Sequence, residues 1–488
     1  MQKIERKKEK QLSSKLLIAA AVVFLLLCTG AILLLNRPEA PVHPETEERN
    51  LLLYQKDLSL LSSITLYRNE EQEVRLLYQD GSLLREDLPE TPLSESASES
   101  LLSLAQSLTA DEFIMELPEQ TSIPLASYGL DPAERSAVFR YTDGTEISLL
   151  VGSLMPIENP RYYAMVAGQN ALYSVTQDVR DTVSRTSENL HPVQRPQINS
   201  ELVDRITVTG DTEFDAVRTA LGWQMIKPLP YPLSKGSMDN LLSQLDNIRF
   251  AGWIGYADQV NLTELGLSEP KRTLTITFAE TIVTAPNEEG LEQSFTLPSN
   301  QMSFSMGNSR NDTSFYMRYE DQVYTGTVLS FSFLQNFSWE KYVEADPISS
   351  VPVQTLDRVI LEAGVQKTVY DITYTERVMQ NNEFETDEYG NFLYDMRVSC
   401  DGAAVDADSF VRWYQSLSCL RGTQRTEQKT QTDFSDPLLT LTLVREEDGF
   451  ERTVSVCPYS SVQNLLFVDG VSLYLIDSGW QTSMTQAP

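Results

Sequence analysis

The residue types that most often carry catalysis are scarce in this sequence. Only two histidines occur in 488 residues, His43 and His191, and a proline follows each of them. A Ser-His-Asp or Cys-His site needs a base held within about 3 Å of its nucleophile, and linker-like stretches of this kind do not hold one. Zinc sites are equally unsupported, because no close Cys or His pair exists. The sequence therefore assigns no catalytic, cofactor-binding or metal-binding residue.

One short motif has the spacing of a known active site. Ser338 and Lys341 match the Ser-x-x-Lys of penicillin-recognising enzymes, but no Ser-Asp-Asn or Lys-Thr-Gly element accompanies them. The sequence also has no Gly-x-x-x-x-Gly-Lys-Ser/Thr loop and no Gly-x-Gly-x-x-Gly. We interpret the Ser-x-x-Lys match as chance and expect no nucleotide partner.

Carboxylates are abundant, and one group of them resembles a calcium loop. If Gly390, which follows Glu383–Glu388, takes the sixth loop position, Tyr389 falls at the fifth and Met396 at the twelfth. The twelfth position must supply a carboxylate, so we interpret this stretch as a solvated loop. No pair of acids is singled out for glycoside hydrolysis, and a carboxylate-dependent hydrolase is the least supported function.

An acidic residue followed by proline stands between the helix and the closing strands of each predicted module, at Asp131, Glu269 and Asp436. Proline lacks an N–H and can open a strand where no ladder partner is lost, and it pushes the residue before it into extended geometry. Gly129 and Gly266, shortly before the first two acids, permit a left-handed bend. We therefore interpret these acids as part of a structural turn that returns the chain from a helix to a sheet.

Aromatic residues gather in the predicted strands that follow this turn. Such side chains could form a binding face for a peptide or a glycan, but they more often pack a sheet against its helix, which is the interpretation we prefer. They are Tyr162, Tyr163, Tyr173, Phe315, Tyr316, Tyr319 and Tyr324.

The cysteines do not define a disulfide framework. Cys28 lies inside an apolar run and is expected to be a buried membrane residue, whereas Cys400, Cys419 and Cys457 form an odd set with at most one bridge. A Cys400–Cys419 bridge in an oxidising compartment and buried free thiols are both compatible with the sequence.

The N-terminus predicts a membrane anchor. Residues 1–15 are a basic tail, with six Lys or Arg against two Glu, and 16–35 form an uncharged run in which thirteen residues are Leu, Ile, Val or Phe. Twenty helical residues span about 30 Å, the thickness of the hydrocarbon core. The positive-inside rule places the basic tail in the cytoplasm and the rest of the chain outside. A cleaved signal peptide would need a shorter apolar core and a small-x-small cleavage site, so an uncleaved anchor is favoured.

The formal net charge of −31 restricts the partners. Nucleic acid and anionic lipid surfaces need clustered Lys and Arg to release counterions, so nucleic-acid binding is close to excluded. We interpret the acidity as a source of solubility.

The remaining pattern predicts an α+β fold with three similar modules, each a mainly antiparallel sheet with one packed helix. After a Pro-rich linker at 36–61, the modules cover 62–190, 200–340 and 355–484. Each has two strands, a helix, the acid-Pro turn and four strands in that order. In the first module, Ser96 and Glu99 have the spacing of a capping box at the start of the helix.

The turn Tyr128-Gly129-Leu130-Asp131-Pro132, with Gly152 and Leu172-Tyr173-Ser174-Val175 after it, resembles the bacterial family called domain of unknown function 4340. The resemblance is clearest over 125–180, recognisable over 262–335 and weak over 433–480. It implies one N-terminal membrane helix and a large repeated extracytoplasmic part. It also implies an association with the permease and auxiliary subunit of an ABC transporter that resembles the gliding-motility type. It implies no catalytic residue and no cofactor.

These observations predict a non-enzymatic, membrane-anchored extracytoplasmic protein that works as an accessory or interaction component of an ABC-transporter or cell-envelope complex. The alternative is a binding protein for cell-wall glycan or peptide.

Overall fold

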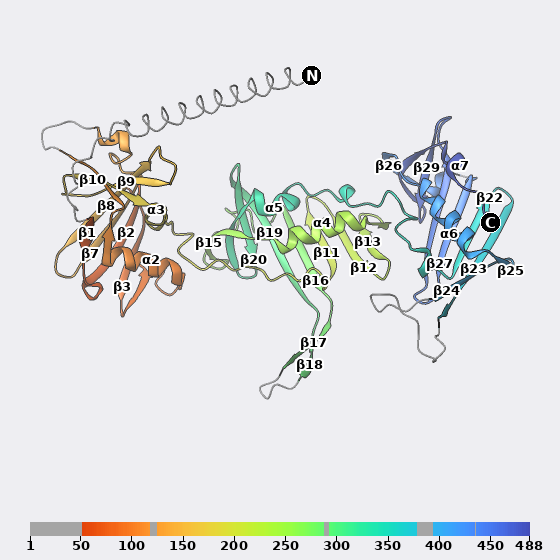
Figure 1. Ribbon diagram of the computed structural model, residues 1–488, viewed down its shortest axis with the longest axis horizontal. Helices are drawn as coiled ribbons and strands as arrows, with labels where there is room; N and C mark the ends of the chain where they lie inside the picture. The colour runs from red at the N-terminus through yellow and green to blue at the C-terminus, as the bar shows by residue number, and fades with distance from the viewer. Residues whose placement is uncertain (1–50, 118–123, 287–291, 378–393, 435) are drawn as a thin grey trace, which may run out of the picture. The chain divides into compact units, whose positions relative to one another are not determined.

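The computed structural model of the chain describes residues 51–117, 124–286, 292–377, 394–434 and 436–488. Within these ranges the fold is α+β and rich in antiparallel sheet, as the sequence predicts (Figure 1). No helix in the described ranges is long and apolar enough to cross a membrane. The predicted span at 16–35 lies outside these ranges, and so do His43, Cys28 and the acidic stretch Glu383–Glu388.

Three large sheets contain most of the strands. The first has the order β4 (Ser82–Arg85), β3 (Glu71–Gln79), β2 (Leu61–Arg68), β7 (Arg135–Tyr141), β8 (Glu146–Leu154), β9 (Arg161–Val166), β10 (Ala171–Thr176), β6 (Glu112–Glu116). The second has the order β14 (Tyr231–Pro232), β13 (Gly222–Lys227), β12 (Phe214–Thr219), β11 (Val203–Gly210), β16 (Arg272–Phe278), β19 (Asn300–Asn311), β20 (Ser314–Tyr319), β21 (Gln322–Thr327), β15 (Phe250–Tyr256). The third has the order β25 (Ala403–Val405), β24 (Tyr394–Cys400), β23 (Gln366–Glu376), β22 (Arg358–Ala363), β27 (Leu439–Arg445), β28 (Phe450–Pro458), β29 (Gln463–Val468), β30 (Val471–Asp477), β26 (Gln424–Thr430).

The chain follows one path through each of these sheets. It begins in the middle with β2, β11 or β22, runs outward to one edge and forms a helix. It then adds a strand at the opposite edge, β6, β15 or β26, and returns to the middle beside its first strand. A four-stranded meander ends next to the added strand. The sequence pattern predicts the meander and the helix but not the added edge strand, because short, polar segments such as β26 lack an apolar alternation.

One helix packs on each sheet through an apolar stripe. The helices are α2 (Glu95–Gln106), α4 (Lys235–Asp246) and α6 (Ala407–Ser416), and shorter helices follow the last meander strand of each sheet: α3 (Gln177–Val183), α5 (Val328–Gln335) and α7 (Trp480–Ser483). Leu101 of α2, Leu245 of α4 and Phe410 of α6 are all fully buried. Each such side chain contributes about 1.5–3 kcal/mol of transfer free energy, which fixes the helix on its sheet.

Two local predictions in the N-terminal part differ from the structure. α2 begins at Glu95 and the carbonyl of Ser94 accepts from the Ser98 N–H at 2.9 Å, so Ser94, not Ser96, precedes the helix. The predicted capping box is therefore wrong. Strand β1 (Leu52–Gln55), paired with β5 (Ser107–Thr109), lies inside the range predicted as a linker, because Leu53 is buried in the core there.

The glycine of the acid-Pro turn has the same backbone conformation before the first and second meanders. Gly129 and Gly266 both adopt left-handed conformations, with φ of 69° and 70°, as predicted. A side chain on Gly152 in β8 would place its Cβ 2.0 Å from the Tyr128 carbonyl oxygen. In β19 the Cβ of a side chain on Gly307 would lie 2.3 Å from the Leu265 carbonyl oxygen. Each turn therefore rests directly on a strand glycine of the meander that follows it.

The third acid-Pro turn reaches the left-handed conformation at a different residue. It has no glycine, and Asp436 itself adopts a left-handed conformation with φ of 61°. The prediction that the acid before each proline is extended is wrong at Asp436. Aspartate tolerates the left-handed region better than most residues, so it replaces the missing glycine.

The described residues divide into two compact units, one with 51–71 and those within 101–184, the other with 72–100 and those within 185–488. The second and third sheets both lie within the second unit. There Val468 and Leu473 belong to the same core cluster as Tyr231 and Leu233 of the second sheet. The predicted ranges 62–190, 200–340 and 355–484 remain a prediction.

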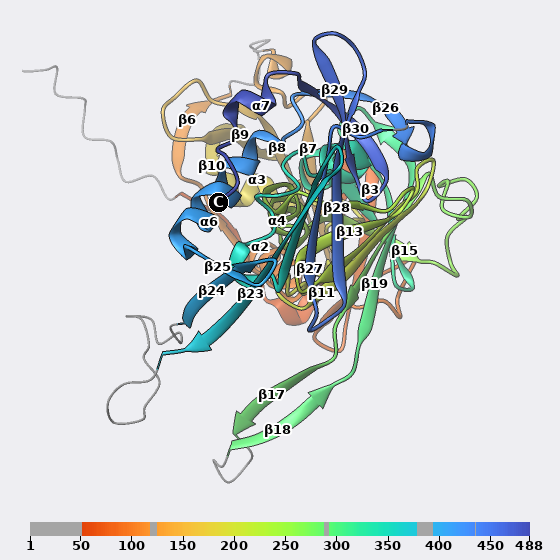
Figure 2. The same ribbon diagram turned by 90° about the vertical axis from the view of Figure 1, so that its right-hand side faces the viewer.

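One hairpin extends beyond the second sheet. β17 (Thr281–Pro286) and β18 (Glu292–Leu297) pair only with each other and continue β16 and β19 as a two-stranded ribbon (Figures 1 and 2). Ile282, Phe295 and Leu297 on this ribbon are exposed. The sequence marks its position as an insertion between strands that are joined by short turns in the other two sheets.

Candidate functional site

A pocket of about 710 Å³ is the best candidate site in the described part of the chain. Its walls come from three segments of the second compact unit: the β12–β13 hairpin, the start of α4 and the segment that leads to the third sheet. The lining residues are Arg218, Thr219, Ala220, Leu221, Gly222, Trp223, Leu233, Ser234, Lys235, Gly236, Asp239, Glu344, Asp346, Ser349, Ser350, Pro352 and Thr355.

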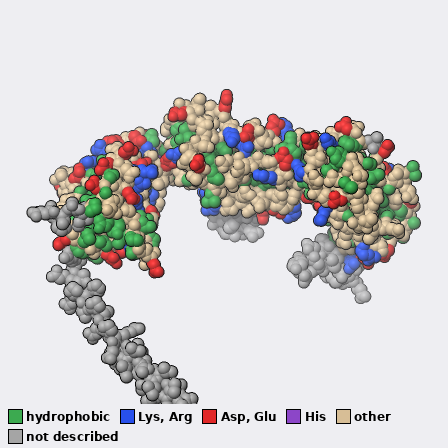
Figure 3. Space-filling model, turned by 90° about the horizontal axis from the view of Figure 1, so that it is seen from above, with side chains coloured by type: hydrophobic (Ala, Val, Ile, Leu, Met, Phe, Trp, Pro, Cys, Tyr) green, Lys and Arg blue, Asp and Glu red, His purple; other side chains and the backbone are tan. Residues whose placement is uncertain are grey.

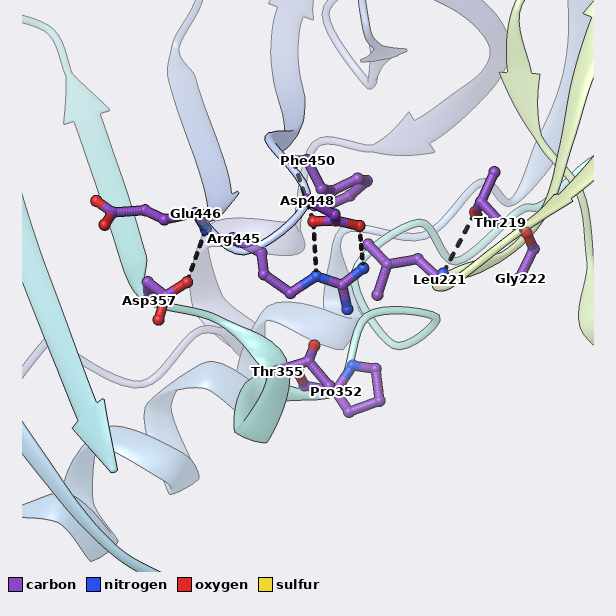
Figure 4. Close-up of polar contacts among 10 residues, drawn as sticks. All are labelled: Thr219, Leu221, Gly222, Pro352, Thr355, Asp357, Arg445, Glu446, Asp448 and Phe450. Carbon is purple, nitrogen blue, oxygen red and sulfur yellow. Dashed lines mark hydrogen bonds and ion pairs between the residues drawn. The ribbon is translucent and has the colours of Figure 1, made fainter. Parts of the chain in front are cut away.

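The first wall is a tight hairpin turn. The Thr219 hydroxyl donates to the Gly222 carbonyl at 2.8 Å and accepts from the Leu221 N–H at 3.3 Å, which closes the turn on itself. This directs Leu221 outward, and its side chain packs against the core of the third sheet. Figure 4 shows Leu221 at the tip of the hairpin, with Pro352 and Thr355 on the neighbouring segment.

The third sheet supports the pocket from behind this tip. Arg445 is buried and donates to both carboxylate oxygens of Asp448, at 2.9 and 2.6 Å (Figure 4). Asp357 accepts from the Glu446 N–H at 2.7 Å, which ties β22 to the same turn. The hydrogen bonds from Arg445 hold the pKa of Asp448 below its ordinary value. These contacts fix the surface against which Leu221 rests.

The second and third walls are joined by backbone hydrogen bonds. The Ser234 N–H donates to the Tyr342 carbonyl at 2.7 Å, and the Glu344 N–H donates to the Pro232 carbonyl at 2.9 Å. Leu233 and Val343 form an antiparallel bridge between them. This short ladder places Glu344 beside the first turn of α4.

Two carboxylates dominate the third wall. A Glu344 carboxylate oxygen accepts from the Asp346 N–H at 2.8 Å, and Asp346 accepts from the Ser349 N–H at 3.0 Å. Burial raises the pKa of Glu344, and the charge of Asp346 raises it further against the lowering effect of backbone hydrogen bonds. Among the described residues, neither acid has an ion-pair partner within 4 Å.

Three hydroxyl groups of the pocket have backbone carbonyls as their acceptors. Thr219 donates to the Gly222 carbonyl, Ser350 to the Pro347 carbonyl at 2.9 Å, and Thr355 to the Pro352 carbonyl at 2.8 Å. A catalytic hydroxyl instead donates to a base. Glu344 and Asp346 lie on one wall, joined through a single turn, and the third carboxylate of the lining, Asp239 of α4, is paired with Lys235.

Ser338 and Lys341 have different hydrogen-bond partners in the structure. Lys341 donates to the Asn336 carbonyl at 2.8 Å, and the Ser338 hydroxyl bonds the Glu340 carboxylate. The serine and the lysine therefore do not activate each other. No group of three or more His, Cys, Asp or Glu in the described residues is placed to hold a metal ion.

His191 is not in a linker, contrary to the sequence-based prediction. Its ring packs against Trp253 at an interplanar angle of 48°, with centroids 4.4 Å apart, and its nitrogens contact an Arg85 Nη atom and the Pro92 carbonyl, both at 2.9 Å. Burial lowers the pKa of His191. It packs in a buried network with these three residues.

Three of the seven aromatic residues of the meanders are buried, and the other four are half-buried. Phe315, Tyr319 and Tyr324 are buried in the core of the second sheet, as preferred from the sequence. Tyr163 packs edge-on against Tyr128, and the Arg310 guanidinium covers the Tyr316 ring. The remaining two, Tyr162 and Tyr173, are half-buried.

Of the two alternatives for the cysteines, the structure shows free thiols and no Cys400–Cys419 bridge. Cys400, Cys419 and Cys457 are not bridged, and the Cys419 thiol donates to the Trp480 carbonyl at 3.5 Å. Burial raises the pKa of each of these thiols.

The surface carries both signs of charge. On the face in Figure 3, acidic and basic side chains are interspersed over the described residues. Such a surface fits the interpretation of the net charge as a source of solubility.

Comparison with known proteins identifies one family. The family described as "Domain of unknown function (DUF4340)" matches residues 86–270. This part of the chain is similar to DUF4340 domains. The match begins directly after β4 and ends at Pro270, in the turn before β16. The DUF4340 match therefore contains the later part of the first sheet and the opening strands and helix of the second. No curated protein and no solved structure matches the chain.

The pocket itself was not predicted from the sequence. The DUF4340 match includes its first two walls, from Arg218 to Asp239, but not the wall with Glu344 and Asp346. The walls lie more than a hundred residues apart in the sequence and carry no motif that links them. Only the position of Glu344 just after the second meander, in an acidic stretch between two predicted modules, could have drawn attention to it.

Proposed function

We propose that the protein is a non-enzymatic, membrane-anchored extracytoplasmic component of an ABC-transporter or cell-envelope complex, and that its three sheets are copies of one module. The observation that supports this proposal best is the pocket, in which the hydroxyls of Thr219, Ser350 and Thr355 donate to backbone carbonyls and the carboxylates of Glu344 and Asp346 share one wall. Such a lining can bind a ligand or a partner segment but provides no nucleophile paired with a base. The apolar run at 16–35 supplies the anchor.

Crosslinking in cells tests the partnership. The full chain is crosslinked mildly, purified and analysed by mass spectrometry, and we expect to recover a transporter permease or auxiliary subunit. The control is residues 1–50 fused to an unrelated soluble domain, which reports proteins that are merely close to the anchor. Recovery of the same proteins with both baits, or of no transporter or envelope component, would contradict the proposal.

The pocket also favours a second candidate, a binding protein for cell-wall peptide or glycan. Sedimentation of the full chain with purified sacculi tests this candidate. Because the aromatic meander residues are largely packed, Glu344→Gln is the more informative variant than Tyr163→Ala with Tyr316→Ala. Retention on sacculi that falls in Glu344→Gln would support this candidate, and no retention of the unchanged chain would exclude it.

A further inference from the structure

The pocket combines an apolar wall with an acidic one. Leu221, Trp223 and Leu233 line it from the second sheet and Pro352 from the opposite segment. Against these residues stand the carboxylates of Glu344 and Asp346. A cavity of about 710 Å³ is large enough for an organic ligand of many atoms.

The two basic residues of the lining, Lys235 and Arg218, have partners other than Glu344 and Asp346. Lys235 pairs with Asp239 at 2.8 Å within α4. Arg218 donates to the Glu201 and Ser200 carbonyls at 2.9 and 3.0 Å, and its guanidinium covers the Trp223 ring at 5.2 Å. Within the lining, the charges of Glu344 and Asp346 therefore have no basic side chain paired with them.

The positive charge behind the acidic wall offsets the negative charge of Glu344 and Asp346 only in part. Arg452 is almost completely buried and lies 3.6 Å from Asp469, and its effect on Glu344 is the smallest of the contributions that shift that group. Tyr231, from β14, is buried and faces both Arg452 and Glu344. Burial dominates, and it keeps the ionised form of Glu344 unfavourable. A cation entering the pocket would relieve this cost.

We propose that the pocket binds a ligand that carries a primary ammonium group on an apolar body. The ammonium contacts Glu344 and Asp346, and the body lies against Leu221, Trp223 and Leu233. An alkylamine and the amino terminus of a peptide share this chemistry. The inference rests on the proposed function only in that the pocket binds and does not catalyse.

Calorimetry on the full chain in detergent at pH 6.5 tests the inference with matched probes. Hexylamine is compared with N-hexylacetamide, and tetra-alanine amide with its N-acetyl form, so that each pair differs only in the ammonium group. We expect at least one amine to bind about tenfold tighter than its acetylated partner, the effect of about one charge-assisted hydrogen bond. The probe that binds identifies the source of the amine. Equal binding within both pairs would overturn the proposal.

Two variants of the acidic wall test whether the amine binds in the pocket. Glu344→Gln keeps the acceptor for the Asp346 N–H and removes only the charge, and Asp346→Asn does the same for the Ser349 N–H. We expect each to weaken amine binding about tenfold, and the exposed Glu264→Gln to leave it unchanged. Unchanged binding in both pocket variants would overturn the proposal. Amine binding without recovery of a transporter or envelope component would remove the proposed partnership and leave this inference standing.

Discussion

The contact between the acid-Pro turn and the strand glycine behind it can be tested by adding one methyl group. In Gly307→Ala the new Cβ would lie 2.3 Å from the Leu265 carbonyl oxygen, whereas a carbon and an oxygen in close contact are about 3.3 Å apart. The turn must therefore move by about 1 Å. The Asn308 N–H donates to the same oxygen at 2.8 Å, so this movement takes the bond beyond hydrogen-bonding range.

Overpacking and the lost hydrogen bond together determine the expected loss of stability. Overpacking costs about 1–3 kcal/mol, and a lost backbone hydrogen bond adds about 1 kcal/mol. We expect the turn and β19 to be destabilised by about 2–4 kcal/mol. At about 1.4 kcal/mol per factor of ten, amide hydrogen exchange there should accelerate by about 30- to 700-fold.

The assay is hydrogen exchange followed by mass spectrometry, because a chain with more than one compact unit does not unfold as a single step. Peptides that cover 262–270 and 304–310 report the local change. Gly236→Ala is the control, since no atom lies within 4 Å of its Cβ position and its φ is not left-handed. Exchange in Gly307→Ala equal to that of the unchanged chain would refute the reasoning.

Three further outcomes follow from buried groups. The pKa of His191 is lowered from 6.5, so the stability it contributes is present above that value and is lost as the pH falls through the folded pKa. Thermal unfolding of His191→Gln should lack this acid-side loss, and an identical pH profile would argue against it. The raised pKa of Glu344 has the opposite effect on stability, which it lowers as the pH rises. Glu344→Gln should be more stable than the unchanged chain at pH 7, with the difference vanishing below pH 4.5, and a less stable variant at pH 7 would contradict this. In native protein, iodoacetamide should modify the half-exposed Cys400 and spare the fully buried Cys457, and mass spectrometry showing equal modification would count against the described burial.

The sequence predicted the parts of the fold that have strong local signals. Phe410 and Trp413 mark α6 at helical spacing, and Asp80-Gly81 marks a hairpin, because both patterns act over a few residues. The edge strands β6, β15 and β26 escaped prediction because they are held by pairing with distant strands. Their own side chains alternate weakly.

The candidate site was beyond prediction for the same reason. Glu344 and Asp346 look like ordinary acids in a chain with 69 of them. What distinguishes Glu344 is a ladder between residues 232–234 and 342–344, which buries it beside α4. His191 was misplaced because the proline after it suggested a linker, whereas its packing against Trp253 depends on a partner 62 residues away.

The central claim, that the acidic wall of the pocket binds a cation, is tested most directly by the pH dependence of hexylamine affinity. Calorimetry on the full chain from pH 7 to pH 4.5 should show the affinity falling as Glu344 takes up a proton, because its pKa lies above 4.5. The affinity of Glu344→Gln should already be low at pH 7 and should fall less over the same range. A wild-type affinity that does not change with pH, or that falls equally in the variant, would contradict the claim.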